Sequence, residues 1–366
     1  MNLAFSQEQV FIQQQAADFL REQCDMTAVR SVLDGSDIFH QSLWQQIVDL
    51  GWTAMTIPET YGGLGLGYLE LCVIAQELGA ALAPVPFLSS IVMATDSLKL
   101  SNDDSLKKHW LPKLASGNVI ATLALFDGAE QPCRVTDGKI SGRKLPVMDG
   151  NIANIAIVLA VDDNHQQQLY LVDIAQQEVT VNELASMDPS KNIADISFEQ
   201  AAVTVISYSN STESIIDQLL DTAAVVCAFE QIGGAEKAMQ AGIAYTKNRY
   251  AFGRQVASFQ AIKHIFADMF VALELAKSNA YYGAWALSSA AVELPLAAAT
   301  ARVSASEAFY SISKENIEVH GGMGFTWEFD CHLYYRRAQF LAATIGTMPQ
   351  WQDKLVNALL DQGLKA

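Results

Sequence analysis

A basic turn that could hold an anion lies in the second half of this acidic chain. Arg249 and Arg254 flank Phe252-Gly253, between two stretches with the apolar spacing of helices. A guanidinium group matches a phosphate or pyrophosphate with paired hydrogen bonds, and glycine lets the backbone approach a ligand closely. Gln260, after the turn, could meet the polar edge of a nucleotide. Because such a turn by itself is more often a plain surface turn, this interpretation depends on the rest of the chain.

A glycine-rich turn after a later helical stretch is the second candidate. Gly321, Gly322 and Gly324 fall within four residues, directly after His320. A turn of this composition can pass close to a flat ligand, because glycine has no Cβ atom to keep the ligand away.

Composition predicts a large protein with more than one core. The chain has 366 residues, of which 51% are hydrophobic and 17% charged, so two or three domains are expected. Neither a membrane-spanning apolar run nor a signal peptide at Met1 to Glu8 is apparent, so we expect a cytoplasmic protein. A net charge of −17 disfavours nucleic acid and anionic membranes as partners. A polyanionic cofactor would therefore need a local basic site, such as the turn at Arg249.

Cysteine usage argues against both a disulfide framework and a zinc site. The five cysteines form no Cys-x-x-Cys pair and are odd in number. We therefore predict no metal and five buried thiols, at positions 24, 72, 133, 227 and 331.

Hydrophobic periodicity predicts an α+β multidomain protein. Residues 1–115 have helical spacing, with breaks at Pro58 to Gly67 and at Pro84 to Pro86, and residues 211–366 form a helical bundle. Between them, residues 116–210 predict a small β-domain with short β-rich runs at 120–125, 152–161, 169–172, 179–181 and 202–208. In the third domain one apolar stripe is expected to contain Ile216, Leu219, Leu220, Ala223 and Cys227.

Together, the two turns resemble the flavin-binding signatures of the acyl-CoA dehydrogenases. Nearer the N-terminus, Leu43-Trp44, Leu50-Gly51-Trp52, Ile57 to Leu66 and Gln76 to Gly79 are similar to the family in order and spacing, so the resemblance extends over essentially the whole chain. It implies the same order of helical domain, β-domain and helical bundle.

The resemblance implies FAD-dependent α,β-dehydrogenation of an acyl-CoA thioester derived from a fatty acid or a steroid. It implies an electron-transfer flavoprotein as electron acceptor, and a homo- or hetero-oligomer, expected to be a tetramer. In such a protein the FAD contacts would come from residues that match the family, often across a subunit boundary: Arg249, Phe252, Gln260, Gly321, Gly322 and Thr347.

The resemblance also implies a catalytic carboxylate that this chain lacks at the matching positions. An α-proton beside a thioester is weakly acidic, so its removal needs a base that is held close and raised in pKa by burial. Most members place this base in a Glu-Gly-Thr segment, where this chain reads Ile345-Gly346-Thr347. A minority place it at the position of Ala223, and Ala224 replaces a supporting arginine.

Other acidic residues are weaker candidates for the base. Glu230 lies two helical turns beyond Ala223 on the same face, where a glutamate is more often the structural partner of an Arg or Lys. Asp221 lies about 200° around the helix from Ala223. For His320 we expect a packing or hydrogen-bonding role, and for Asp330, Arg336 and Arg337 a solvated or ion-paired helix face.

Two segments of the β-domain depart from the family's isoalloxazine-lining pattern. Leu123 to Glu130 stands where members carry Thr-Glu-Pro, and Lys144 to Gly150 replaces a strand with Trp-Ile-Thr. Two interpretations follow. The chain is either a self-sufficient dehydrogenase with an unrecognised base, or a catalytically degenerate subunit that braces FAD for a homologous catalytic subunit. The missing base favours the second.

Overall fold

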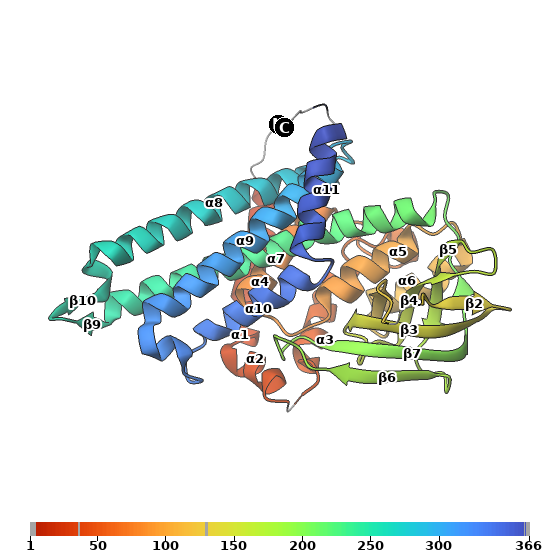
Figure 1. Cartoon of the computed structure of the whole chain (residues 1–366), viewed down its shortest axis with the longest axis horizontal. Coiled ribbons are helices and arrows are strands. Elements are labelled where there is room, and N and C mark those ends of the chain that lie inside the picture. The colour runs from red at the N-terminus through yellow and green to blue at the C-terminus, as the bar shows by residue number, and fades with distance from the viewer. Residues whose placement is uncertain (1–4, 36, 129–130, 362, 364–366) are drawn as a thin grey trace. The chain divides into compact units, whose positions relative to one another are not determined.

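The computed structural model describes residues 5–35, 37–128, 131–361 and 363 (Figure 1). These residues form two compact units. The helical unit comprises Met1–Val29, Tyr68–Ala83 and Ala224–Ala366, and the sheet unit comprises Arg30–Gly67 and Pro84–Ala223.

Long helices build the helical unit. Figure 1 shows the second half of α7, α8 and α9 running alongside one another. Helix α9 is rich in alanine, and its small side chains allow a close approach, because a Cβ atom on Gly283 of α8 would lie 3.2 Å from the Cβ of Ala301. The helices of this unit are α1 (Gln7–Gln23), α4 (Tyr68–Ala80), α7 (Thr212–Asn248, which begins in the sheet unit), α8 (Gln260–Ser288), α9 (Leu294–His320), α10 (Cys331–Ala343) and α11 (Met348–Asp361).

Helices α4 and α7 cross with their backbones in contact. A Cβ atom on Gly79 would lie 1.9 Å from the carbonyl oxygen of Glu230, and one on Gly233 would lie 1.8 Å from that of Gln76. Only glycine fits at these two positions, so the crossing fixes the places of Gln76 on α4 and Glu230 on α7.

A mixed sheet organises the sheet unit. Its strand order is β6-β7-β3-β2-β4-β5-β8, with β1 parallel to β4, and most neighbours are antiparallel. Alternate side chains such as Val158, Val172 and Ile196 form its apolar core. The strands are β1 (Ala121–Ala124), β2 (Arg134–Thr136), β3 (Lys139–Met148), β4 (Ile155–Val161), β5 (Gln167–Asp173), β6 (Val179–Leu184), β7 (Ile193–Ala202) and β8 (Thr204–Val205).

Short helices complete the sheet unit before the first strand. They are α3 (Gln41–Asp49), η1 (Trp52–Ala54), η2 (Glu59–Tyr61), the π-helix η3 (Phe87–Ala94), α5 (Thr95–Lys99) and α6 (Asp104–Ala115), while α2 (Met26–Leu33) crosses the boundary of the units. The predicted breaks at Pro58 and Pro84 both fall between helices.

The predicted order of helices, strands and helices is confirmed. The boundaries 1–115, 116–210 and 211–366 stay a prediction. Each predicted β-rich run contains part of a strand, but β2, β3 and β7 were not predicted, and residues 152–154 precede β4. On the predicted stripe of α7, Leu219, Ala223 and Cys227 are buried, whereas Ile216 and Leu220 are only half-buried.

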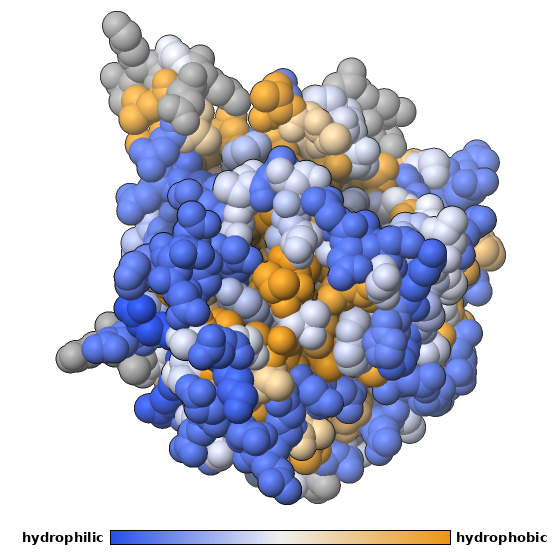
Figure 2. All heavy atoms as spheres, turned by 90° about the vertical axis from the view of Figure 1, so that its right-hand side faces the viewer, coloured by the Kyte–Doolittle hydropathy of each residue, from blue (hydrophilic) through white to orange (hydrophobic). Residues whose placement is uncertain are grey.

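The five cysteines are free and buried, as predicted. Among the described residues, no helix is long and apolar enough to cross a membrane. Hydrophilic side chains cover much of the face shown in Figure 2, with apolar side chains visible between them.

Candidate functional site

The basic turn is a two-stranded hairpin that connects α7 and α8. Strand β9 (Tyr250–Ala251) pairs with β10 (Arg254–Gln255), and Phe252 and Gly253 form the tip with φ of 52° and 78°. Positive φ angles at both central residues fit a tight hairpin, in which glycine has no steric penalty. Phe252 is 96% exposed at this tip. The Arg254 guanidinium lies 3.9 Å from the centre of the Phe259 ring, a cation–π contact.

A cavity of about 460 Å³ brings together residues of both predicted turns. Gly321 and Gly322 begin η5 (Gly321–Phe325), where α9 ends, and a Cβ atom on either glycine would meet no atom within 4 Å. Their backbone therefore leaves space beside it, as expected for a turn that approaches a flat ligand. The lining residues are Tyr245, Arg249, Val256, Ile262, Glu318, Val319, His320, Gly321, Gly322 and Met323.

Three of the six predicted cofactor contacts line this cavity, namely Arg249, Gly321 and Gly322. The other three do not. Phe252 lies at the hairpin tip, Gln260 is the first residue of α8, and the Thr347 hydroxyl donates a hydrogen bond of 3.0 Å to Gln350. These six assignments stay predictions.

The wall of the cavity includes a tyrosine that sequence reasoning missed. The ring of Tyr245 stacks on that of His320, with 4.1 Å between their centres. Tyr245 could have been predicted to lie beside Arg249 from its position one helical turn earlier, because residues four apart share a helix face. His320 Nδ1 lies 2.7 Å from the carbonyl oxygen of Asn316 and donates to it. Burial lowers the pKa of His320, against the opposite effect of this hydrogen bond, which favours the neutral imidazole beside Tyr245.

Glu230 is held in the core by an ion pair. Its carboxylate accepts a hydrogen bond of 3.2 Å from Arg337 Nη1, and both side chains are buried. Arg337 Nη2 donates to the carbonyl oxygen of Leu82 at 2.9 Å. Arg337 is fully buried, so the expectation of a solvated helix face was wrong for this residue and the ion-paired alternative holds. Glu230 thus behaves as a structural partner.

A second buried guanidinium near Glu230 relies on neutral groups. Arg302 is 1% exposed and donates to Cys227 Sγ at 3.2 Å, to Gln231 Oε1 at 3.1 Å and to the carbonyl oxygen of Leu341. Burial lowers the pKa of Arg302, and the charge of Glu230 opposes this effect. The Glu230 charge therefore helps to keep two buried cations in place.

We expect Glu230→Gln to destabilise the protein by about 1 to 3 kcal/mol, because it removes the negative charge that pairs with Arg337 Nη1 in the core. Urea unfolding followed by circular dichroism measures the change. Glu22→Gln, which removes the same charge from an exposed position of α1, is the matched control. Equal stability of Glu230→Gln and the parent would contradict a structural role for this ion pair.

The two matching base positions are apolar and buried. Ile345 is 2% exposed, and Ala223 and Ala224 are fully buried. Asp221 is also buried, at 3%. None of Ile345, Ala223 and Ala224 has a group that takes up a proton.

In the sheet unit, the two segments that depart from the flavin-lining pattern are closed against each other. Lys144 is fully buried, and its ammonium group lies 2.6 Å from an Asp127 carboxylate oxygen and 3.1 Å from the carbonyl oxygen of Leu125. Backbone hydrogen bonds from Gly128 to Arg143 and from Leu145 to Phe126 join the segments further. Ala129 and Glu130, at the end of the first segment, lie outside the described residues.

Comparisons with known proteins identify the family. The model of the acyl-CoA dehydrogenase N-terminal domain matches residues 6–118, and that of the C-terminal domain matches residues 213–348. The chain is 30% identical to acyl-CoA dehydrogenase IpdE2 of Mycobacterium tuberculosis over 335 residues, which cover 91% of each chain.

Solved structures share the fold. The chain matches a structure described as the ChsE4-ChsE5 complex from Mycobacterium tuberculosis with a TM-score of 0.90 and 23% identity, covering 99% of both chains. It matches a Tcur3481-Tcur3483 steroid ACAD variant with a TM-score of 0.88 and 23% identity, covering 98% of this chain and 99% of that one. With these matches, the chain belongs to the acyl-CoA dehydrogenase family.

Proposed function

We propose that this chain is the non-catalytic subunit of a heteromeric, FAD-dependent acyl-CoA dehydrogenase, in which a homologous subunit carries the base. The proposal rests on the residues at the candidate base positions. Ile345 and Ala223 cannot accept a proton, and Glu230 is held by Arg337 in the core. Removal of an α-proton needs a carboxylate held against the substrate, and these positions offer none.

The activity of the complete assembly would be α,β-dehydrogenation of a CoA thioester of a fatty acid or steroid. Bound FAD would supply the acceptor for the β-hydrogen, which leaves as hydride, and an electron-transfer flavoprotein would remove the electrons. The role of this chain would be to help bind and orient the FAD. Arg249 would pair with the pyrophosphate, and the backbone at Gly321 and Gly322 would lie against the cofactor.

The fit of FAD to this chain is uneven. The cavity at the hairpin offers an exposed guanidinium and open glycine backbone, which suit the phosphate-bearing part of the cofactor. In the sheet unit, Lys144 and Asp127 satisfy each other, and a Cβ atom on Gly128 would lie 1.6 Å from a methyl group of Leu145. The side chains of Lys144 and Asp127 are therefore not available to contact an isoalloxazine ring. This unevenness supports a subunit that contributes to a cofactor held mainly by its partner.

The comparisons support the heteromeric arrangement. One matched structure is described as a complex of two differently named chains, ChsE4 and ChsE5, and another is called a steroid ACAD. By analogy, the partner of this chain would be a homologous subunit with an intact base, and the substrate class would include steroid CoA thioesters.

Mass analysis and flavin stoichiometry test the proposal. The chain should be purified alone and after co-expression with a homologous chain that carries the glutamate of a Glu-Gly-Thr segment. We expect a mixed oligomer that contains flavin and turns over acyl-CoA, and little flavin or turnover for the chain alone. A chain that retains stoichiometric FAD and is active alone would contradict the proposal and favour a self-sufficient dehydrogenase.

We expect Arg249→Ala to weaken FAD binding roughly tenfold or more, because a charge-assisted contact is worth about 1.5 to 3 kcal/mol. Titration of the assembled apoprotein with FAD, followed by fluorescence, measures the dissociation constant. Arg254→Ala is the matched control, since it removes the same charge from the same hairpin but from a side chain outside the cavity lining. An unchanged dissociation constant in Arg249→Ala would exclude the assigned role.

A further inference from the structure

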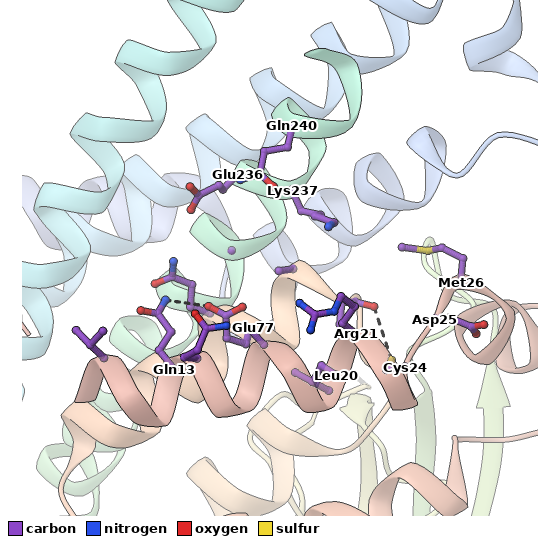
Figure 3. A pocket seen from close by; sticks show the side chains of 17 residues that line it. Gln13, Leu20, Arg21, Cys24, Asp25, Met26, Glu77, Glu236, Lys237 and Gln240 are labelled. Atoms are coloured by element: carbon purple, nitrogen blue, oxygen red, sulfur yellow. Dashed lines mark hydrogen bonds between the residues drawn. The ribbon is translucent and has the colours of Figure 1, made fainter. Parts of the chain in front are cut away.

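A second cavity lies in the helical unit, among residues that the proposed function does not use. It has a volume of about 560 Å³ and is lined mainly by residues of α1, α4 and α7. Figure 3 shows Gln13 of α1 and Glu77 of α4 on one side, with Glu236, Lys237 and Gln240 of α7 opposite. The cavity has no lining residue in common with the one at the hairpin.

Gln76, in this lining, has an unsatisfied acceptor. Its side chain is 5% exposed, and no donor among the described residues reaches Oε1. The close crossing of α4 and α7 fixes its backbone, because the Gly233 backbone packs against the Gln76 carbonyl group. Buried carbonyl oxygens nearly always accept a hydrogen bond, so this one calls for a donor from a ligand.

Glu77, the next residue, places a carboxylate in the same cavity. It accepts a hydrogen bond of 2.8 Å from Gln13 Nε2, an uncharged donor, and no ion pair with another described residue neutralises it. Burial raises the pKa of Glu77; the hydrogen bond from Gln13 opposes this shift, and the charge of Glu236 adds to it. Glu236 itself is paired with Lys277 at 2.9 Å. A carboxylate that is partly desolvated and bonded only to an amide favours a cationic partner.

Two cationic side chains, Lys237 and Arg21, also line this cavity. Lys237 is exposed, and Arg21, 70% exposed, is paired with Asp18. Lys237 lowers the pKa of Glu77, but its effect is smaller than those of burial, of the hydrogen bond from Gln13 and of the charge of Glu236. No group of three or more potential metal ligands occurs among the described residues, which argues for an organic cation and against a metal ion.

We propose that this cavity binds a small organic cation with several N–H donors, a guanidinium or primary ammonium group, which donates to Gln76 Oε1 and pairs with Glu77. One donor would satisfy the buried carbonyl oxygen, and the charge would compensate the carboxylate. A guanidinium group can donate to two acceptors at once, because its several N–H groups point in fixed directions. The inference is independent of FAD binding and of the missing base.

Isothermal titration and thermal shift measurements on the full chain test this proposal. The probes are agmatine, which has a guanidinium and an ammonium group, and tetramethylammonium, which has charge but no N–H donor. We expect agmatine to bind with one site per chain and to raise the melting temperature, and tetramethylammonium at equal ionic strength to do neither. Equal effects of the two cations would indicate general charge screening and overturn the proposal, as would no binding of agmatine.

Two substitutions locate the site. Glu77→Gln removes the charge with little change of shape, and Gln76→Leu removes the unsatisfied oxygen. Each should weaken agmatine binding roughly tenfold. Glu22→Gln, an equal charge change on the exposed face of α1, should leave binding unchanged. If Gln76→Leu fails to fold, Glu77→Gln alone decides, and agmatine affinity equal to that of the parent would overturn the assignment.

A last probe distinguishes the source of the cation. A capped peptide that contains one arginine presents the same guanidinium group as the side chain of another protein would. Tighter binding of the peptide than of agmatine supports a cation carried by a partner chain, and the reverse supports a free amine. Loss of both in Glu77→Gln is required in either case.

Discussion

Purified alone, this chain is expected to show negligible acyl-CoA dehydrogenation. Loss of a positioned general base removes about 10² to 10⁴ of rate, and Ile345 and Ala223 occupy both positions where the family resemblance implies a carboxylate. In addition, Lys144 and Asp127 are committed to each other in the segments that should face the flavin ring, so a further loss is expected. The activity should appear only when the homologous subunit is present.

A ferricenium-coupled assay over short, long and steroid-like CoA thioesters measures this activity. The parent chain should be compared with Glu230→Gln and Asp221→Asn, which replace the two remaining candidates for the base. The prediction is that all three are inactive alone. Robust turnover by the parent that one of these substitutions abolishes would identify the base and refute the proposal of a non-catalytic subunit.

Restoring a carboxylate with Ile345→Glu should recover little activity. Ile345 is 2% exposed, so any side chain at this position is buried, and its backbone is fixed by a hydrogen bond of 3.1 Å from Trp351 Nε1 to its carbonyl oxygen. A glutamate there would be costly to bury in its ionised form. Ala224 would still lack the supporting charge that the family resemblance implies.

The sequence predicted the features that depend on local pattern or on residue type. The order of helices, strands and helices followed from hydrophobic periodicity. The absence of a carboxylate at residues 223 and 345 followed directly from the residue types at those positions. The missed strands have an equally local cause. Strand β3 contains Gly142 and Pro146, and β7 contains Asp195 and Glu199, residues that are typical of turns and surfaces rather than strands.

Long-range pairing was beyond a single sequence. Glu230 and Arg337 lie 107 positions apart, and nothing local to Arg337 distinguishes a buried partner from one on a charged helix face. Lys144 gave no sign of full burial, because a lysine in a strand normally extends to solvent. The free space beside the Gly322 backbone also could not be predicted, because a glycine-rich composition predicts a turn but not the space around it.

That free space makes Gly322→Val the sharpest test of the cofactor site. A Cβ atom on Gly322 would meet no protein atom within 4 Å, and its φ lies outside the left-handed region, so the substitution should leave the fold intact. Gly321 does not offer the same test, because its φ of 61° would strain any larger residue. In the assembled enzyme, however, a valine side chain would stand where we propose that backbone lies against FAD.

We therefore expect Gly322→Val to abolish flavin retention in the assembly, with Gly322→Ala giving a smaller loss because it adds one methyl group in place of three carbons. Flavin absorbance per chain after gel filtration measures retention, and the circular dichroism spectrum and melting temperature report on the fold. The decisive comparison is between these readouts. Loss of flavin with an unchanged melting temperature assigns the space beside Gly322 to the cofactor, whereas full flavin stoichiometry in Gly322→Val would reduce this turn to a structural connection between α9 and α10.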